Sequence, residues 1–147
     1  MTENASAANE HAGRVREMFG NIADRYDLLN HLLSANVDKR WRRIVANKVR
    51  DRLSAPNSAR ILDVACGTGD LSQTLFETTG AQVVGTDFCR PMLAIAAGKI
   101  SGQVPLIEGD ALRLPFRSDS FDAVTIAFGL RNLSSVEDGL AELWRVL

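Results

Sequence analysis

The stretch from Asp63 to Gly69 combines residue types that could hold a ligand. It reads Asp-Val-Ala-Cys-Gly-Thr-Gly and follows an apolar run that is typical of a buried parallel strand. Gly67 and Gly69 permit positive φ and let a ligand approach the bare backbone closely. Apolar residues at helical spacing come next, so the stretch predicts a strand, a ligand loop and a helix in succession. An ordinary tight turn between strand and helix is the alternative interpretation.

The spacing of the small residues separates two classes of ligand. A dinucleotide fingerprint, G-x-G-x-x-G, requires a third glycine where this chain has Ser72. The register Asp63-x-Ala65-x-Gly67-x-Gly69 is instead similar to the acidic-G-x-G-x-G pattern of class I methyltransferases, with alanine at the first glycine. That pattern suits a ligand without phosphate, such as S-adenosylmethionine.

Two further carboxylates follow predicted strands. Asp87 lies 24 positions after Asp63, a separation that in a right-handed βαβ unit brings a carboxylate to the tip of the adjacent strand. There it could accept hydrogen bonds from both ribose hydroxyls, and capping of the next helix is the alternative. Asp110 could accept from an adenine amino group while the Ala111 N–H donates to a ring nitrogen. A plain turn aspartate is the alternative for Asp110.

Alternating strands and helices are expected to position these residues. Strand-helix repetition with buried strands predicts an α/β fold, a Rossmann-like, doubly wound parallel sheet of strand order 3-2-1-4. The ligand crevice should open at the switch point between the carboxyl ends of the first and fourth strands. Arg131 and Asn132 would then face the Gly67 loop across that crevice. The predicted strands cover residues 61–64, 82–86, 104–108 and 123–128.

Three segments are expected along the chain. They are a flexible leader over residues 1–13, N-terminal helices on the lid and substrate side over 14–55, and an α/β core over 56–147. The second segment contains an amphipathic helix with a basic face, which is either solvated or in contact with anionic lipid. Its apolar stripe is predicted to comprise Trp41, Ile44, Val45, Val49 and Leu53.

Composition limits the class of protein. The chain has 147 residues, 46% of them hydrophobic, and a formal net charge of -1, which fits one modest domain without a bulk nucleic-acid footprint. No signal peptide is recognisable, so a cytoplasmic location is expected. Cys66 and Cys89 are predicted to be free thiols, and neither they nor His11 and His31 have the spacing of a metal site.

The last predicted helix carries an apolar stripe on which the chain stops. A capping box over residues 134–137 should start this helix. The expected stripe comprises Leu140, Leu143, Trp144 and Leu147.

Four segments give the chain a specific family resemblance. From Val15 to its last residue it resembles the ubiquinone/menaquinone biosynthesis C-methyltransferases. The resemblance implies S-adenosylmethionine as cosubstrate and metal-free C-methylation of a polyprenylated benzoquinol or naphthoquinol. By this resemblance the chain would be an N-terminal portion of such an enzyme, with C-terminal strands of the core missing, and its fourth strand would then be an exposed apolar edge. The matching segments are FGNIADRYDLLN (19–30), LDVACGTGDL (62–71), GDA with LPF (109–111 and 114–116) and TIAFGLRN (125–132).

By this resemblance the family's cofactor positions carry over to individual residues. They are Thr68, Asp87, Asp110 and Ala111, beside Asp63, Gly67 and Gly69 of the loop. Ala127 also lines the expected cofactor site, where many members have a serine. Other departures are Cys66 in place of glycine, Cys89 in place of asparagine, and Asp38 in place of histidine, which puts any substrate role of that position in doubt.

The chemistry implied for the acceptor assigns roles to three more residues. A quinol carbon becomes nucleophilic once its ortho hydroxyl is deprotonated, so the site must stabilise a phenolate and exclude water. Arg131 cannot act as a base, so we expect it to stabilise charge and orient a water molecule, with Asn132 alongside. Tyr26 is expected to close the pocket. A salt bridge that fixes the strand end is the alternative role for Arg131.

The expected partners are a polyprenylated quinol, a membrane surface contacted peripherally and a second copy of the chain, with no nucleic acid and no metal. Three rival functions stay open at this point. The chain could be a non-catalytic cofactor-binding or interaction fragment, a methyltransferase for another small molecule, or a nicotinamide oxidoreductase.

Overall fold

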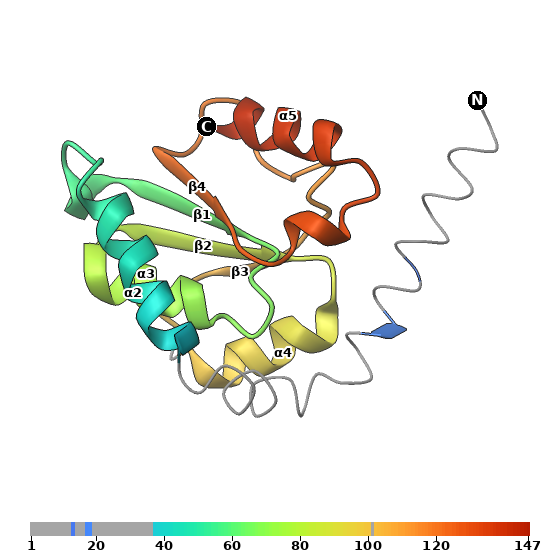
Figure 1. Cartoon of the computed structure of the whole chain (residues 1–147), viewed down its shortest axis with the longest axis horizontal. Coiled ribbons are helices and arrows are strands. Elements are labelled where there is room, and N and C mark those ends of the chain that lie inside the picture. The colour runs from blue at the N-terminus through green and yellow to red at the C-terminus, as the bar shows by residue number, and fades with distance from the viewer. Residues whose placement is uncertain (1–12, 14–16, 19–36, 101) are drawn as a thin grey trace.

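The computed structural model describes residues 13, 17–18, 37–100 and 102–147, and its centre is a four-stranded parallel sheet of order β3-β2-β1-β4 (Figure 1). The predicted strand order is therefore confirmed. The third and fourth strands are shorter than predicted because regular pairing covers only part of each apolar run. The strands are β1 (Arg60–Val64), β2 (Gln82–Asp87), β3 (Leu106–Glu108) and β4 (Ala123–Ile126).

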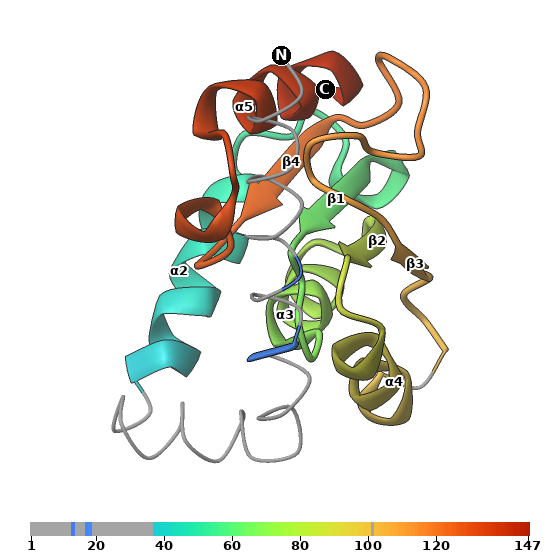
Figure 2. The ribbon, with the colours of Figure 1, turned by 90° about the vertical axis from the view of Figure 1, so that its right-hand side faces the viewer.

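Helices cover both faces of this sheet. Figure 2 shows α2, α3 and α4 on one face and α5 on the other, as a doubly wound fold requires. The helices are α2 (Val37–Arg50), α3 (Asp70–Thr79), α4 (Arg90–Lys99) and α5 (Val136–Val146), with short 3₁₀ turns η1 (Pro56–Ser58) and η2 (Leu130–Asn132). None of the helices in the described ranges is long and apolar enough to cross a bilayer.

The side chains of β1 alternate between two hydrophobic clusters. Ile61 packs with α2, α3 and α4, whereas Leu62 and Val64 pack with α5. Asp63 shares the Ile61 face, and strand alternation therefore directs a carboxylate toward α3. One acidic residue is thus enclosed among the buried apolar residues of β1.

The pairing register aligns the carboxyl ends of three strands. Val64 of β1 is level with Thr86 on β2 and Ile126 on β4. Behind β4 the chain passes close to the glycine loop, since a Cβ added to Gly129 would lie 2.3 Å from the Ala65 Cβ. The loop and the segment after β4 therefore adjoin at one edge of the sheet.

The last helix differs from its predicted pattern in two ways. Its N-cap is Ser135, whose side chain accepts from the Asp138 N–H, one residue later than the predicted capping box. The predicted apolar stripe is divided. Leu143 is buried with Val146, whereas Trp144 is 76% exposed, and Leu140 and Leu147 are exposed as well. The helix meets the sheet along a face rotated from the one that the sequence pattern favoured. β4 lies at the sheet edge, as expected, but all four of its residues are half-buried and not exposed.

Helix α2 also meets the core along a shifted face. Ala46 is fully buried, and Trp41, Val45 and Val49 pack against the same cluster. The prediction that Ile44 belongs to the buried stripe is wrong, because its side chain is 48% exposed. Residues 14–16 and 19–36 of the predicted N-terminal helical segment, and the leader apart from residue 13, lie outside the described residues.

Candidate functional site

The glycine loop between β1 and α3 adopts three left-handed backbone positions. Ala65, Gly67 and Gly69 have φ values of 53°, 57° and 82°. Ala65 therefore occupies a conformation that favours glycine, which explains why the related pattern has glycine there. Gly69 favours glycine because of its φ of 82°, and an added Cβ would also force the Ile100 side chain to shift.

Asp63 lies beneath this loop and anchors the start of α3. Its carboxylate accepts the Ser72 hydroxyl at 2.6 Å and the Thr125 hydroxyl at 2.9 Å, and it also accepts the Ser72 backbone N–H. The side chain is 1% exposed, and burial raises its pKa to about 6 despite these hydrogen bonds. The nearby charge of Asp87 acts in the same direction. The hydrogen-bonding capacity of Asp63 is thus used, but burial still disfavours its charged form.

Asp87 joins the end of β2 to the same loop. One carboxylate oxygen accepts the Gly67 N–H and the other accepts the Cys89 N–H, each at 2.8 Å. Burial raises the pKa of Asp87, and the backbone N–H groups of residues 89, 67 and 88 oppose that shift. The helix-capping alternative is not what is observed, since Cys89 is the N-cap of α4. Asp87 instead braces two loops, and ribose binding stays a prediction.

A charge network that the sequence reasoning missed lies at the rim of the loop. Lys99 Nζ lies 3.3 Å from the Thr68 hydroxyl and 2.6 Å from the Asp70 carboxylate. Arg42 donates to Asp70 at 2.7 Å and also to Asp38. The network ties α2, α3 and α4 together around the predicted cofactor residue Thr68, which is itself buried.

The predicted adenine residues form a turn. Asp110 is exposed and its carboxylate accepts the Leu112 N–H at 2.9 Å, which is the arrangement of the plain-turn alternative. Ala111 is buried in the cluster under α5. A carboxylate oxygen can accept more than one hydrogen bond, so adenine binding stays a prediction for this pair.

An aromatic platform follows β4 beside the loop. Trp41 of α2 stacks on Phe128 with ring centroids 5.4 Å apart and planes 13° from parallel. The Arg131 guanidinium carbon lies 5.9 Å from the centre of the Phe128 ring. No ion pair between described residues includes Arg131, so the salt-bridge alternative is not found in this part of the chain. Arg131 therefore presents an exposed cation over an aromatic ring.

The other predicted residues divide into placed and unplaced ones. Asn132 is half-buried in η2, where its backbone N–H donates to the Gly129 carbonyl. Ala127 is half-buried on the sheet face that α2, α3 and α4 cover. Tyr26 lies outside the described residues.

The cysteines are free thiols within the described ranges. Burial, with the charges of Asp63 and Asp87, raises the pKa of the Cys66 thiol well above its usual value, so Cys66 is a poor nucleophile. Cys89 is buried. No group of candidate metal ligands occurs among the residues that the structure describes.

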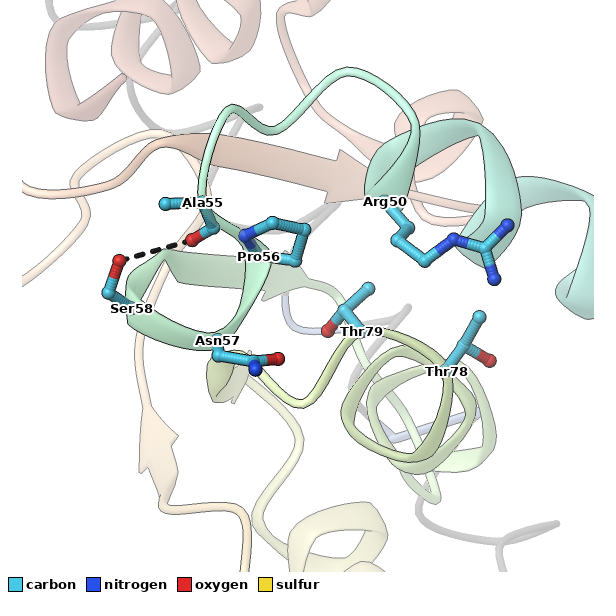
Figure 3. A pocket seen from close by; sticks show the side chains of 7 residues that line it. All are labelled: Arg50, Ala55, Pro56, Asn57, Ser58, Thr78 and Thr79. Carbon is cyan, nitrogen blue, oxygen red and sulfur yellow. Dashed lines mark hydrogen bonds between the residues drawn. The ribbon is translucent and has the colours of Figure 1, made fainter.

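A surface hollow of about 600 Å³ lies away from this site (Figure 3). It is lined by residues from the end of α2, the η1 turn and the end of α3, including Arg50, Asn57 and Thr79. These residues precede β1 or form the C-terminal end of α3, so the hollow is at the amino edge of the sheet. The predicted ligand site belongs to the opposite, carboxyl edge.

The partners of Asp63 were missed, although the sequence contains a signal for each. Thr125 is the polar residue within the apolar fourth strand, and Ser72 lies on the inward face of α3 with Leu71 and Leu75. A polar residue at such a position indicates a buried hydrogen-bond partner. By contrast, nothing local links Arg42 to Asp70, which is 28 residues away.

Comparisons with known proteins identify the family of this chain. The sequence model of the ubiE/COQ5 methyltransferase family matches residues 6–147. A demethylmenaquinone methyltransferase of Thermus thermophilus is 54% identical over 88% of this chain and 59% of its own length. A ubiquinone/menaquinone biosynthesis C-methyltransferase of Citrifermentans bemidjiense is 43% identical over 96% and 61%. The chain thus spans about 60% of the length of these curated relatives.

A solved structure extends the comparison to the fold. The structure of a Methanococcus maripaludis protein, described as a candidate S-adenosyl-L-methionine-dependent methyltransferase, matches with a TM-score of 0.75. It is 20% identical, and the match covers 87% of this chain and 58% of that one, so it supports the fold alone. Together with the sequence matches, these findings show that the chain belongs to the ubiE/COQ5 methyltransferase family.

Proposed function

We propose that this chain binds S-adenosylmethionine and takes part in C-methylation of a polyprenylated quinol, a demethylmenaquinol or the corresponding ubiquinone precursor. The observation that carries the proposal is the state of the loop's backbone donors. The Gly67 N–H donates to Asp87, the Ser72 N–H at the start of α3 donates to Asp63, and the Gly69 N–H donates to the Cys66 carbonyl. These donors are therefore not free for a phosphate.

The charges behind the loop support the same choice of ligand. Asp63 and Asp87 are buried carboxylates at 1% and 6% exposure. Two buried negative charges would repel a pyrophosphate, which argues against a nicotinamide dinucleotide. They would attract a cationic ligand, and S-adenosylmethionine carries a sulfonium and an ammonium group. The residues present fit this cofactor, with Thr68, Asp87, Asp110 and Ala111 as its proposed contacts and Ala127 nearby.

The acceptor side would be served by the residues after β4. When bound, S-adenosylmethionine supplies an electrophilic methyl group. The Arg131 guanidinium is a cation with several N–H donors, so its proposed role is to stabilise the phenolate form of the quinol. Asn132 would hold a water molecule or the second oxygen, and Tyr26 would close the site. The Trp41–Phe128 stack offers an apolar surface for the ring or its prenyl tail.

Calorimetric titration with S-adenosylhomocysteine, followed by methylation of a demethylated quinol, tests this proposal. Saturable binding and methyl transfer are the expected results. Affinity for NAD with none for S-adenosylhomocysteine would overturn the proposal. A tail-less catechol methylated faster than the quinol would point to another small-molecule acceptor.

A non-catalytic cofactor-binding fragment is the second candidate. It is favoured by the span of the match, which covers about 60% of the curated relatives' length. Binding of S-adenosylhomocysteine without turnover would identify this alternative. The proposed setting is the cytoplasm with peripheral contact to a membrane, and the proposed assembly is a homodimer, which sedimentation equilibrium would test.

A further inference from the structure

Positive charge is concentrated on one helix of this chain. Residues 37–52 contain seven Lys and Arg and two Asp, a formal net charge of +5 in a chain whose total is -1. The remainder consequently carries -6. Solubility alone is served by a surface on which charges of both signs are interspersed, so it does not explain why the positive charges are collected on one helix.

The cations lie on the outward half of α2. Arg42 points inward to Asp38 and Asp70, and the apolar residues of the helix face the core. Arg50 pairs with Asp51, which follows the helix, and the other outward cations have no ion pair with any described residue. The basic face of α2 consists of Lys39, Arg40, Arg43, Lys48 and Arg50, all exposed.

An apolar residue interrupts this face at its middle. Ile44 is 48% exposed and lies one turn from both Arg40 and Lys48 on the helix. Trp41, three positions before it, stacks on Phe128, which is itself 56% exposed. The basic face is therefore continuous with an apolar strip that leads to the platform under Arg131.

We infer that the basic face of α2 binds the anionic surface of a phospholipid bilayer. Interfacial helices combine Lys and Arg with exposed apolar side chains that enter the headgroup region, and α2 has both. Figure 2 shows α2 at the outer edge of the layer formed by α2, α3 and α4, and the cations of its basic face are exposed. The inference rests on the proposed function in one respect, since a polyprenylated acceptor would reside in the bilayer beside the Trp41–Phe128 platform.

Charge complementarity favours lipid over the other polyanions. A nucleic-acid surface needs phosphate contacts from cations but gains nothing from an exposed Ile44. A bilayer uses both, because each cation near an anionic surface contributes to binding and the apolar side chain adds hydrophobic transfer. Binding to nucleic acid is therefore an outcome that the experiment must be able to report.

Vesicle flotation of the 147-residue chain tests the inference. The vesicles are phosphatidylcholine alone and phosphatidylcholine with phosphatidylglycerol, at low and high salt. We expect binding to the anionic vesicles only, and weaker binding at high salt because salt screens exposed charges. The variant R40Q/R43Q/K48Q should bind about a hundredfold more weakly, since each cation contributes about fivefold. Ile44→Ser alone should weaken binding about fivefold.

The matched control removes the same charge from another surface. R90Q/R113Q/R117Q takes three exposed arginines from α4 and the loop before β4. It should keep vesicle binding within about threefold of the wild type, because those residues lie outside α2. Both triple variants should keep the melting temperature and S-adenosylhomocysteine affinity of the wild type.

Each contrary result overturns the inference. These results are no binding of the wild type to anionic vesicles, an equal loss in both triple variants, or tighter binding to transfer RNA than to vesicles at the same salt. Failure of the proposed function has a different signature. The chain would then lack S-adenosylhomocysteine affinity while its vesicle binding still depended on α2.

Discussion

The glycine loop and the segment after β4 form the two sides of one edge of the sheet, yet they differ in how far their polar and aromatic side chains are buried and hydrogen-bonded. On the loop side, Asp63 and Asp87 are buried and each carboxylate oxygen has a hydrogen-bond partner. On the other side, Phe128 is 56% exposed and Arg131 is exposed. Residues that are already held in place lose little freedom when a ligand binds, whereas exposed residues must be ordered by the ligand or by a neighbouring segment.

The same contrast continues behind each side. Between β1 and α3 the loop is bridged by Arg42, Asp70 and Lys99. Behind the segment after β4, α5 leaves Trp144 76% exposed. We therefore expect substitutions on the loop side to change cofactor affinity and stability, and substitutions on the open side to change turnover.

Arg131 offers the largest expected effect and would break the comparison if it behaved as scaffolding. Arg131→Ala should lower turnover by about 10²–10³, because it removes the proposed hydrogen-bond donor and positive charge beside a developing phenolate. Arg131→Lys keeps the charge but loses the planar fork, so its loss should be smaller. Turnover per folded molecule is measured beside S-adenosylhomocysteine affinity and Tm, both expected to stay near wild type. Loss of Tm with normal turnover would move the search to Asn132 and Tyr26.

Asp63 should give the next largest effect, on pH-dependent stability. Its folded pKa of about 6 is raised from 3.8, so the folded state favours the protonated acid. The free energy of unfolding should therefore be higher below about pH 4 and should fall by about 3 kcal/mol as the pH rises through 6. Asp63→Asn should remove this dependence because an amide does not titrate. The amide can still pair with both hydroxyls, so the variant should fold.

Urea unfolding of the wild type and Asp63→Asn between pH 4 and 7 measures the difference. The control is Asp51→Asn, whose side chain is 65% exposed. An unchanged pH slope in Asp63→Asn would show that another group titrates there. Asp87, whose pKa is also raised by burial, would be the next candidate.

Asp87 tests whether the loop side really holds the cofactor. Asp87→Ala should weaken S-adenosylhomocysteine binding at least about tenfold, because a charge-assisted hydrogen bond contributes about 1.5–3 kcal/mol. It also leaves the Gly67 and Cys89 N–H groups without their observed acceptor, so Tm should fall. Affinity is measured by calorimetry well below that Tm. Lower Tm with unchanged affinity would make Asp87 a loop brace only.

Ala65 gives the smallest expected effect and probes strain in the loop. Its φ of 53° favours glycine, so Ala65→Gly should raise the free energy of unfolding by about 0.5–1 kcal/mol. The control is Ala59→Gly, because Ala59 has an ordinary φ of -72° and glycine should destabilise the chain there. Urea denaturation measures both. Destabilisation by Ala65→Gly would show that the methyl contact with the Gly129 segment outweighs the strain.

Local patterns in the sequence were enough to locate β1, β2 and the loop, because apolar runs and helical spacing depend on neighbouring residues. The order β3-β2-β1-β4 followed from general rules for right-handed, doubly wound sheets. The positive φ at Gly67 and Gly69 was likewise predictable, because only glycine adopts such angles without strain. Helix faces were less predictable. Ile44 and the α5 stripe were misassigned because the pattern does not say which neighbour an apolar side chain meets.

By itself, then, the sequence determined the fold class, the position of the loop and the acids that lie behind it, since these follow from periodicity and backbone chemistry within short segments. Only the tertiary structure decided how those acids are used. Asp63 meets Thr125 across 62 residues, Gly67 meets Asp87 across 20, and Trp41 stacks on Phe128 from another helix. Such contacts depend on which elements pack together, and no local pattern encodes that choice.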